Sequence, residues 1–281
     1  MNITNNKSDH EYFSKMTIPL HIYHEKLKNN IAGTKPSIPI SLFKNNKTKE
    51  RKMVEILGQG GDKIAIKMDN GKALLIPNYT TTLNQEGFWD KVVEGEIQFN
   101  RLLKDQALLC PKYSQATISK DGCTISAYVS ESFEQLAEKK NIYVIDVNYL
   151  TNESSKKAFS IFKKCFFKFD EMQHWKKIFA PLTQDVAKLL SCGIPIPSDS
   201  FNWAVVTTEN SCHVRYFGFD FCGKYKNEEI KPLHKDKIDW INIKARLENV
   251  YYQFSPYYSK FDSEEFIEWA LKKVKEEIER N

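Results

Sequence analysis

The chain has 281 residues, 41% of them hydrophobic and 13% aromatic, which excludes an intrinsically disordered protein and permits two lobes around a sizeable core. Its 41 basic and 36 acidic residues give a formal net charge of +5, a mild excess that permits an anionic partner without predicting nucleic acid binding. No stretch approaches the roughly 18 apolar residues of a membrane span, and the N-terminus lacks a secretory signal, so the sequence predicts a soluble, cytoplasmic protein.

The six cysteines show no CxxC spacing and no nearby histidine partners, which is typical of reduced thiols in a reducing compartment. A bacterial effector injected into the cytosol of a host cell would show the same features, because contact-dependent export needs no N-terminal hydrophobic signal.

Residues 1–50 are rich in Lys, Asn and Ser and predict a partly disordered N-terminal extension. From residue 53 the pattern changes to strands, with Ile64, Ile66 and Met68 alternating along one face. Asn70-Gly71 predicts a two-residue type I′ turn in which Asp69 pairs with Lys72. Residues 53–78 therefore predict a three-stranded antiparallel meander.

The rest of the chain predicts mostly helices. A helix over 84–104 precedes a hairpin around Asp121-Gly122 and a short helix "FEQLAEKK". Residues 154–191 are mostly helical, "WAVV" and "HVRYFGF" form two strands, and helices cover 236–256 and 262–280. The sequence thus predicts an α+β protein with a β-rich N-lobe over 51–130 and a mainly helical C-lobe over 131–281.

The order of several stretches resembles the protein-kinase-like superfamily, and in particular atypical effector kinases of intracellular bacterial pathogens. The matching stretches are "LGQGGDKIAI", "EGEIQFNRLL", "AYVSESFEQL", "PSDSFNWAVV" and "GFDFCGK". The resemblance implies a two-lobed protein-kinase-like fold with a small β-rich N-lobe and a reduced helical C-lobe. It also implies an ATP- and Mg²⁺-dependent phosphotransferase, whose site must cradle phosphates, fix a cation and hold the metal.

In the N-lobe, the resemblance makes Gly58, Gly60 and Gly61 the backbone that approaches the phosphates. Lys63 becomes the cation and Glu96 the carboxylate that orients it. "AYVSES" becomes the linker between the lobes, whose backbone holds the adenine.

Lys67 in "IAIKM" is the other candidate cation. With the predicted turn, Lys67 lies roughly 20 Å from the glycines at about 3.3 Å per strand residue, so we interpret it as solvated. The third strand then offers an apolar residue, about Ile76, where kinases usually carry lysine. A lysine moved to the strand that follows the glycines is similar to the with-no-lysine kinases.

In the C-lobe, Asp199 matches the catalytic Asp that positions the acceptor, and Asn202 and Asp220 match the two Mg²⁺ ligands. Pro197-Ser198 replaces the family's His-Arg, and the spacing from Asp199 to Asn202 is shorter than in the family. These departures leave open a kinase-like pseudoenzyme or a binding module that regulates a host protein. A kinase-fold AMP transferase is a further alternative, because it shares the positioning and Mg²⁺ chemistry.

The segment "SSKKAFSIFKKCFFKF" interleaves lysines with phenylalanines. The simpler interpretation is a solvated basic face over a buried aromatic one. The alternative is a site for an anionic regulator or substrate such as an inositol phosphate or a phosphoinositide headgroup.

Overall fold

The chain divides into two compact units. The computed structural model describes residues 16–17, 37–44, 48–59, 63–68, 70–77, 88–120, 123–145, 153–167, 174–194, 196, 201–208, 211–219, 237–257 and 262–280. We call one unit, of Met1–Arg101, Pro111–Gln135 and Phe221–Lys226, the sheet unit. We call the other, of Leu102–Cys110, Leu136–Asp220 and Asn227–Asn281, the helical unit.

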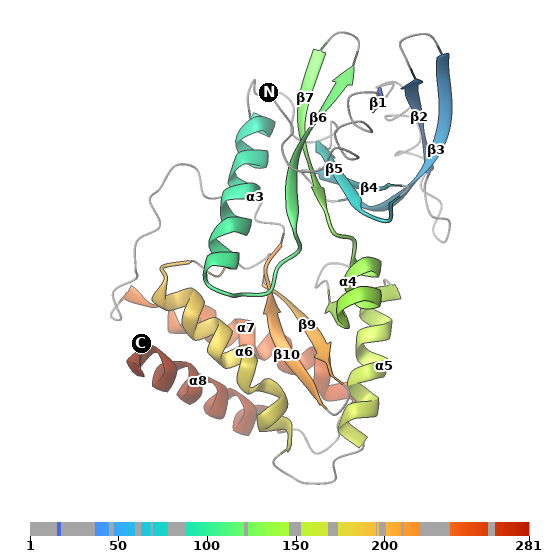
Figure 1. Ribbon diagram of the computed structural model, residues 1–281. Helices are drawn as coiled ribbons and strands as arrows, with labels where there is room; N and C mark the ends of the chain where they lie inside the picture. Colours follow the sequence, from blue (N-terminus) through green and yellow to red (C-terminus); the bar gives the residue numbers. More distant parts are fainter. Residues whose placement is uncertain are drawn as a thin grey trace. The chain divides into compact units, whose positions relative to one another are not determined.

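The sheet unit contains one antiparallel sheet with the strand order β1-β2-β3-β4-β5-β7-β6 (Figure 1). Its strands are β1 (Met16–Thr17), β2 (Ser37–Lys44), β3 (Thr48–Gln59), β4 (Lys63–Lys67), β5 (Ala73–Pro77), β6 (Tyr113–Lys120) and β7 (Cys123–Ser130). Strands β3, β4 and β5 form the predicted meander. Strands β1 and β2 lie within residues 1–50, for which the sequence predicts a partly disordered extension.

The turn between β4 and β5 differs from the predicted type I′ turn. The Met68 N–H donates to the Lys72 carbonyl at 2.8 Å, and Lys67 pairs with Ala73, so the loop spans 69–71. Gly71 has a φ of 77°, whereas Asn70 does not have a positive φ. The side-chain Oδ1 of Asn70 instead accepts a hydrogen bond from the Lys72 N–H. A type I′ turn needs positive φ at both central residues, so the two-residue prediction is wrong by one residue.

Helix α3 (Phe88–Asp105) carries the apolar residues that bind it to the sheet. Trp89, Val92 and Val93 pack with Tyr128 of β7, and Leu75 of β5 packs against the same cluster. The Trp89 Nε1–H also donates to the Ser126 carbonyl of β7 at 2.5 Å. One face of α3 is thereby fixed to the neighbouring strands β5 and β7.

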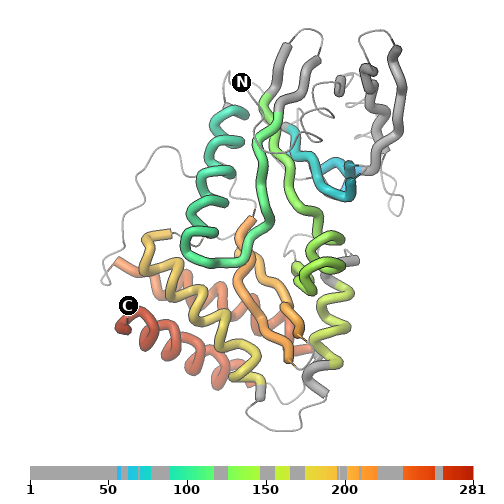
Figure 2. Tube along the Cα trace, in the orientation of Figure 1, coloured from blue at the N-terminus to red at the C-terminus, as the bar shows by residue number. Residues whose placement is uncertain are grey.

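The helical unit contains a three-stranded antiparallel sheet of order β10-β9-β8. Helix α6 packs on β10 and on α8, α7 packs on α8, and α5 packs on β8 and β9 (Figure 2). Phe162, Phe179 and Phe254 contact one another in the core. The elements are α4 (Phe133–Lys140, which begins in the sheet unit), β8 (Ile142–Ile145), α5 (Glu153–Phe167), α6 (His174–Ser191), β9 (Asn202–Thr207), β10 (Cys212–Phe217), α7 (Trp240–Phe254), the 3₁₀ turn η3 (Ser255–Tyr257) and α8 (Ser263–Arg280).

These elements confirm the predicted α+β class, with strands concentrated in the N-terminal part and helices in the C-terminal part. The arrangement is consistent with a protein-kinase-like fold. Five antiparallel strands lie side by side in the order β3-β4-β5-β7-β6, and α3 follows β5 and precedes β6 along the chain. Strand β8 was not predicted. It pairs with β9, and all four of its residues are buried.

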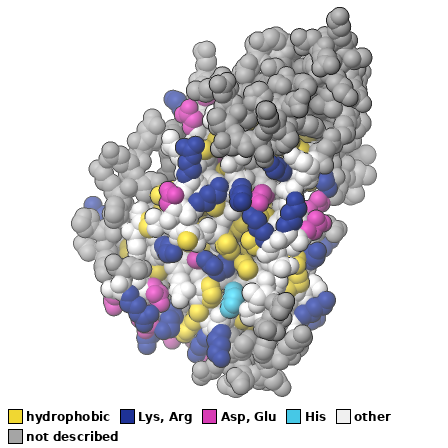
Figure 3. Space-filling view, viewed as in Figure 1, with side chains coloured by type: hydrophobic (Ala, Val, Ile, Leu, Met, Phe, Trp, Pro, Cys, Tyr) yellow, Lys and Arg dark blue, Asp and Glu magenta, His cyan; other side chains and the backbone are white. Residues whose placement is uncertain are grey.

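The described surface carries dark blue Lys and Arg side chains with magenta Asp and Glu side chains between some of them (Figure 3). Within the described residues, no helix combines the length and the apolar character that crossing a bilayer requires.

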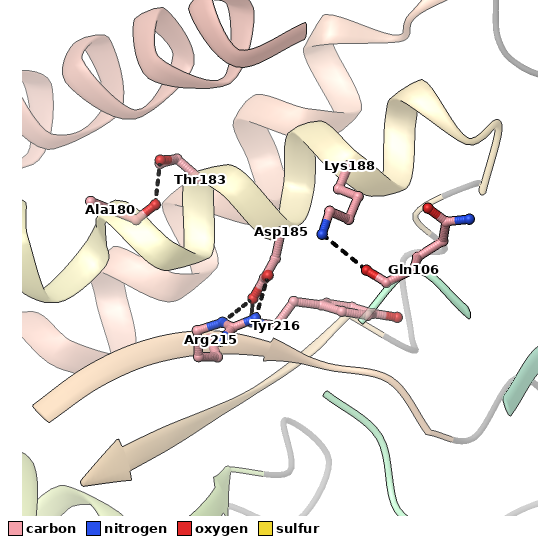
Figure 4. A network of polar contacts seen from close by, with 7 residues as sticks. All are labelled: Gln106, Ala180, Thr183, Asp185, Lys188, Arg215 and Tyr216. Atoms are coloured by element: carbon pink, nitrogen blue, oxygen red, sulfur yellow. Dashed lines mark hydrogen bonds and ion pairs between the residues drawn. The ribbon is translucent and has the colours of Figure 1, made fainter. Parts of the chain in front are cut away.

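A buried carboxylate joins α6 to β10 in the helical unit (Figure 4). The Arg215 Nε–H and one of its terminal N–H groups donate to the two Asp185 oxygens at 2.6 and 2.7 Å, and the Tyr216 backbone N–H donates at 3.1 Å. Burial raises the pKa of the Asp185 carboxyl, while the hydrogen bonds and charge of Arg215 oppose that rise. The pair therefore stabilises α6 on β10 only while Arg215 compensates the buried charge.

We expect Arg215→Met to destabilise the protein by about 3 kcal/mol at about pH 7, because it leaves the Asp185 carboxylate buried without its partner. Without Arg215 the folded-state pKa of Asp185 rises further above its unfolded value. Protonation then favours the folded state, so the loss shrinks toward about pH 5. Urea denaturation at the two pH values measures this. Arg280→Met, which removes an exposed pair with Glu277, is the control and costs under about 1 kcal/mol. A loss independent of pH would contradict the assignment.

Candidate functional site

Lys63 begins β4 and is buried despite its charge. Its exposed fraction is 7%, and the neighbouring Ile64 is fully buried on the opposite face of the strand. The ammonium donates to Glu96 Oε1 on α3 at 2.5 Å, and Glu96 is likewise fully buried. The structure thus brings together two residues that the sequence nominated, 33 positions apart, as a buried ion pair.

Tyr128 is a third member of this cluster, and the sequence interpretation missed it. Its hydroxyl oxygen accepts a hydrogen bond from Lys63 Nζ at 3.0 Å, and the ammonium lies 5.7 Å from the centre of its ring. We expected "AYVSES" to be a linker, but Tyr128 belongs to strand β7. The strand register contains the missing signal, because Ala65, Leu75 and Tyr128 lie opposite one another across three strands.

Lys67, the alternative cation, lies at the other end of β4. Its ammonium pairs with Glu134 at 2.7 Å, and the exposed fractions of the two side chains are 31% and 49%. An exposed pair of this kind contributes little to stability. Lys63 and Lys67 therefore stand on one strand in different environments, and each serves as a control for the other.

The apolar residue on the face of Lys63 is Leu75 rather than the expected Ile76. Ala65 pairs with Leu75, whereas Ile76 pairs with Ile64 on the opposite face of the sheet. Directly paired residues of antiparallel strands share a face. The expected position of the apolar residue was therefore wrong by one residue, because the predicted loop between β4 and β5 was one residue too short.

The predicted phosphate-binding glycines are only partly described. Gly58 lies in β3 opposite Ala65, after a shift in register that begins at Ile56. Gly60 and Gly61 lie outside the described residues, so the role of these glycines stays a prediction.

Asn202 is the first residue of β9 and pairs with Phe217 of β10. Its exposed fraction is 2%, and its Oδ1 is buried without a hydrogen-bond donor among the described residues. A buried carbonyl-type oxygen with unused acceptor capacity fits a hard divalent cation such as Mg²⁺. Asp199 and Asp220, the other two predicted residues of this part of the site, lie outside the described residues.

Gly218 fixes the backbone two residues before Asp220. A Cβ placed there would lie 2.1 Å from Leu103 Cδ1 and 3.1 Å from the Tyr216 ring. The Gly218 N–H also donates to the Leu109 carbonyl at 2.8 Å. The sequence interpretation did not identify this glycine, where an added Cβ would clash with the buried Leu103.

Comparisons with known proteins give a distant likeness. No protein-family model matches the sequence, and no curated protein matches it. The structure of a Helicobacter pylori proinflammatory kinase, CtkA, aligns with a TM-score of 0.29 and 11% identity, over 81% of this chain and 93% of that one. The ADP-bound aminoglycoside phosphotransferase APH(2'')-Ib aligns with a TM-score of 0.23 and 11% identity, over 81% and 94%. At such TM-scores, function has to be argued from this chain's own residues.

We expect Lys63→Met to destabilise the protein by about 3 kcal/mol, because the carboxylate of Glu96 stays buried without its ammonium partner. Lys67→Met, on the same strand, is the matched control and should cost under about 1 kcal/mol. Urea denaturation of both variants and the wild type measures the difference. Equal losses would show that the environments of the two lysines do not differ as described.

Proposed function

We propose that this protein is an ATP- and Mg²⁺-dependent phosphotransferase of the atypical kinase type. The buried Lys63–Glu96 pair carries the proposal. A buried ion pair is weak evidence for stability, because desolvation of both charges offsets their attraction. A fixed cation beside a phosphate site, in contrast, is what phosphoryl transfer needs, since catalysis there consists mainly of positioning and neutralising charge.

In this proposal each nominated residue has one role. Lys63 binds nucleotide phosphate, Glu96 orients Lys63, and the backbone at Gly58, Gly60 and Gly61 approaches the phosphates. Asp199 positions the acceptor hydroxyl and accepts its proton.

Mg²⁺ fits the same proposal through the unused Oδ1 of Asn202, with Asp220 as the second protein ligand. When bound, the ion would neutralise charge on the phosphate oxygens. The position of Asn202 at the start of β9, where it pairs with Phe217, supports this proposed role because it fixes the backbone of the ligand.

The biological setting of the protein and the group that it transfers are more specific parts of the proposal. We propose an effector that a bacterium delivers into a host cell. The two rivals are a pseudoenzyme that binds nucleotide and regulates a host protein, and an AMP transferase on the same fold. Substrate chemistry separates them, because all three share nucleotide binding.

Calorimetric titration with ATP in the presence of Mg²⁺ tests the proposal. We expect the wild type to bind, and Lys63→Met to bind at least about 10-fold more weakly, as loss of a charge-assisted contact to phosphate requires. Lys67→Met should bind as the wild type does. Absence of binding by the wild type, or equal binding by Lys63→Met, would refute the assignment.

Incubation with ATP, Mg²⁺ and pools of candidate acceptors, read by mass spectrometry, then separates the three activities. A phosphoryl adduct that disappears in Asp220→Ala identifies the phosphotransferase. An adenylyl adduct identifies the AMP transferase, and nucleotide binding without either adduct identifies the pseudoenzyme.

We further propose that the outer face of α5 binds a phosphoinositide headgroup. Of the described exposed side chains of this helix, all except Ser160 are lysines, namely Lys156, Lys157, Lys163 and Lys164. Phe159 and Phe162 on the other face contact Phe254, which fixes the helix and its basic face to the core. Charge complementarity to a multiply phosphorylated headgroup supports this proposal.

Binding to vesicles that contain phosphatidylinositol phosphates tests the α5 face. We expect the double variant Lys156→Gln, Lys164→Gln to bind about 30-fold more weakly, at about 1 kcal/mol for each lysine. Lys244→Gln, Lys272→Gln is the control, because both lysines lie beside a glutamate on their own helix. Equal weakening in both variants would show a nonspecific effect of net charge, and the assignment to α5 would fail.

A further inference from the structure

We propose that Tyr128 is a positioning residue, whose hydroxyl fixes the Lys63 ammonium in place for a nucleotide phosphate. This inference rests on the proposed function of Lys63. It assigns to a strand residue a role that the interpretation of the sequence gave to Glu96 alone.

Acceptors from two different elements contact the ammonium. Glu96 approaches from α3 at 2.5 Å and Tyr128 from β7 at 3.0 Å, while Lys63 itself stands on β4. A lysine has a flexible four-carbon stem and three N–H donors around a point charge. Glu96 holds the ammonium from α3, and the Tyr128 hydroxyl restricts it from a second direction, on β7.

The surroundings of Tyr128 show that its hydroxyl has a purpose separate from packing. The ring is fully buried beside Trp89, Val92 and Val93, and the Tyr113 ring lies 5.0 Å away, centre to centre. Phenylalanine would fill this apolar cluster equally well. A phenolic oxygen buried there requires a polar partner, and Lys63 supplies a charged donor.

The neutral charge of the phenol matters for binding an anion. A second carboxylate beside Lys63 would also hold the ammonium, but it would repel the phosphates that Lys63 is proposed to bind. Tyr128 supplies a hydrogen-bond acceptor to the cation without adding a negative charge. The phenol therefore helps to hold the ammonium in place, and the site carries one negative charge fewer than it would with a second carboxylate. Fewer negative charges favour the binding of a phosphate.

The position of the hydroxyl is itself fixed through α3 and β7. The Trp89 Nε1–H donates to the Ser126 carbonyl, two residues before Tyr128 on β7. The same helix carries Glu96 seven residues after Trp89. The Trp89–Ser126 hydrogen bond thus helps to hold the helix that carries Glu96 against the strand that carries Tyr128.

The test compares the affinities of Tyr128→Phe for Mg²⁺-ATP and for adenosine, measured by calorimetry on the full chain. We expect ATP to bind about 10-fold more weakly than to the wild type, on the scale of one hydrogen bond to a charged group, and adenosine to bind unchanged. Tyr113→Phe, which removes a hydroxyl from the neighbouring ring, is the matched control and should leave both affinities unchanged.

A double-mutant cycle with Lys63→Met separates positioning from packing. If Tyr128 acts through Lys63, Tyr128→Phe has no further effect on ATP binding in the Lys63→Met background. A loss that persists there, a parallel loss of adenosine binding, or loss of the cooperative thermal unfolding transition in Tyr128→Phe would assign the hydroxyl to folding and overturn the inference.

The remaining outcomes distinguish this inference from the proposed function. If the wild type binds ATP more tightly than adenosine and Tyr128→Phe keeps the full difference, the inference alone is overturned. If the wild type shows no preference for ATP, the proposed function fails and the inference falls with it.

Discussion

The sheet unit is organised around a buried ammonium. Lys63 is buried at 7% exposure, and Glu96 and Tyr128 supply acceptors to its ammonium, since a charge removed from water without partners is too costly to keep. Those acceptors belong to α3 and β7, so the helix must stay fixed to the sheet. The Trp89–Ser126 hydrogen bond and the apolar cluster around Tyr128 provide that attachment. The charge on β4 therefore constrains how α3 packs on β7.

The helical unit also buries a charged group, the Asp185 carboxylate, and pairs it with an arginine instead of a lysine. Arg215 satisfies both oxygens of Asp185, and the Tyr216 backbone adds a third donor, so the carboxylate is enclosed by fixed hydrogen bonds. Guanidinium suits a permanent clamp of this kind, because its planar donors match a carboxylate in one geometry. The compact ammonium of Lys63 suits a site that must also meet a phosphate. The type of cation thus agrees with a structural role in one unit and the proposed binding role in the other.

Periodicity predicted most elements, because helices such as α3 and α8 bury one stripe and strands such as β4 alternate. It missed β8, whose four buried residues show no alternation that separates a strand from a helix. The choice of Lys63 with Glu96 came from family resemblance, and the structure places the two in contact, while their catalytic roles stay predictions. Tyr128 could not be predicted without the register of β5 and β7, which depends on pairings distant in sequence.

One wrong residue in a turn explains the misplaced apolar position. A two-residue loop would have paired Ala65 with Ile76, whereas the observed loop over 69–71 pairs it with Leu75. Since a one-residue slip moves a side chain to the other face of a sheet, the face of Lys63 carries leucine. That leucine has a physical reason. A second lysine at 75 would lie on the same face as Lys63, in an apolar cluster, and two buried ammonium groups would compete for Glu96. A chain that carries its buried lysine on β4 therefore requires an apolar residue at this place on β5.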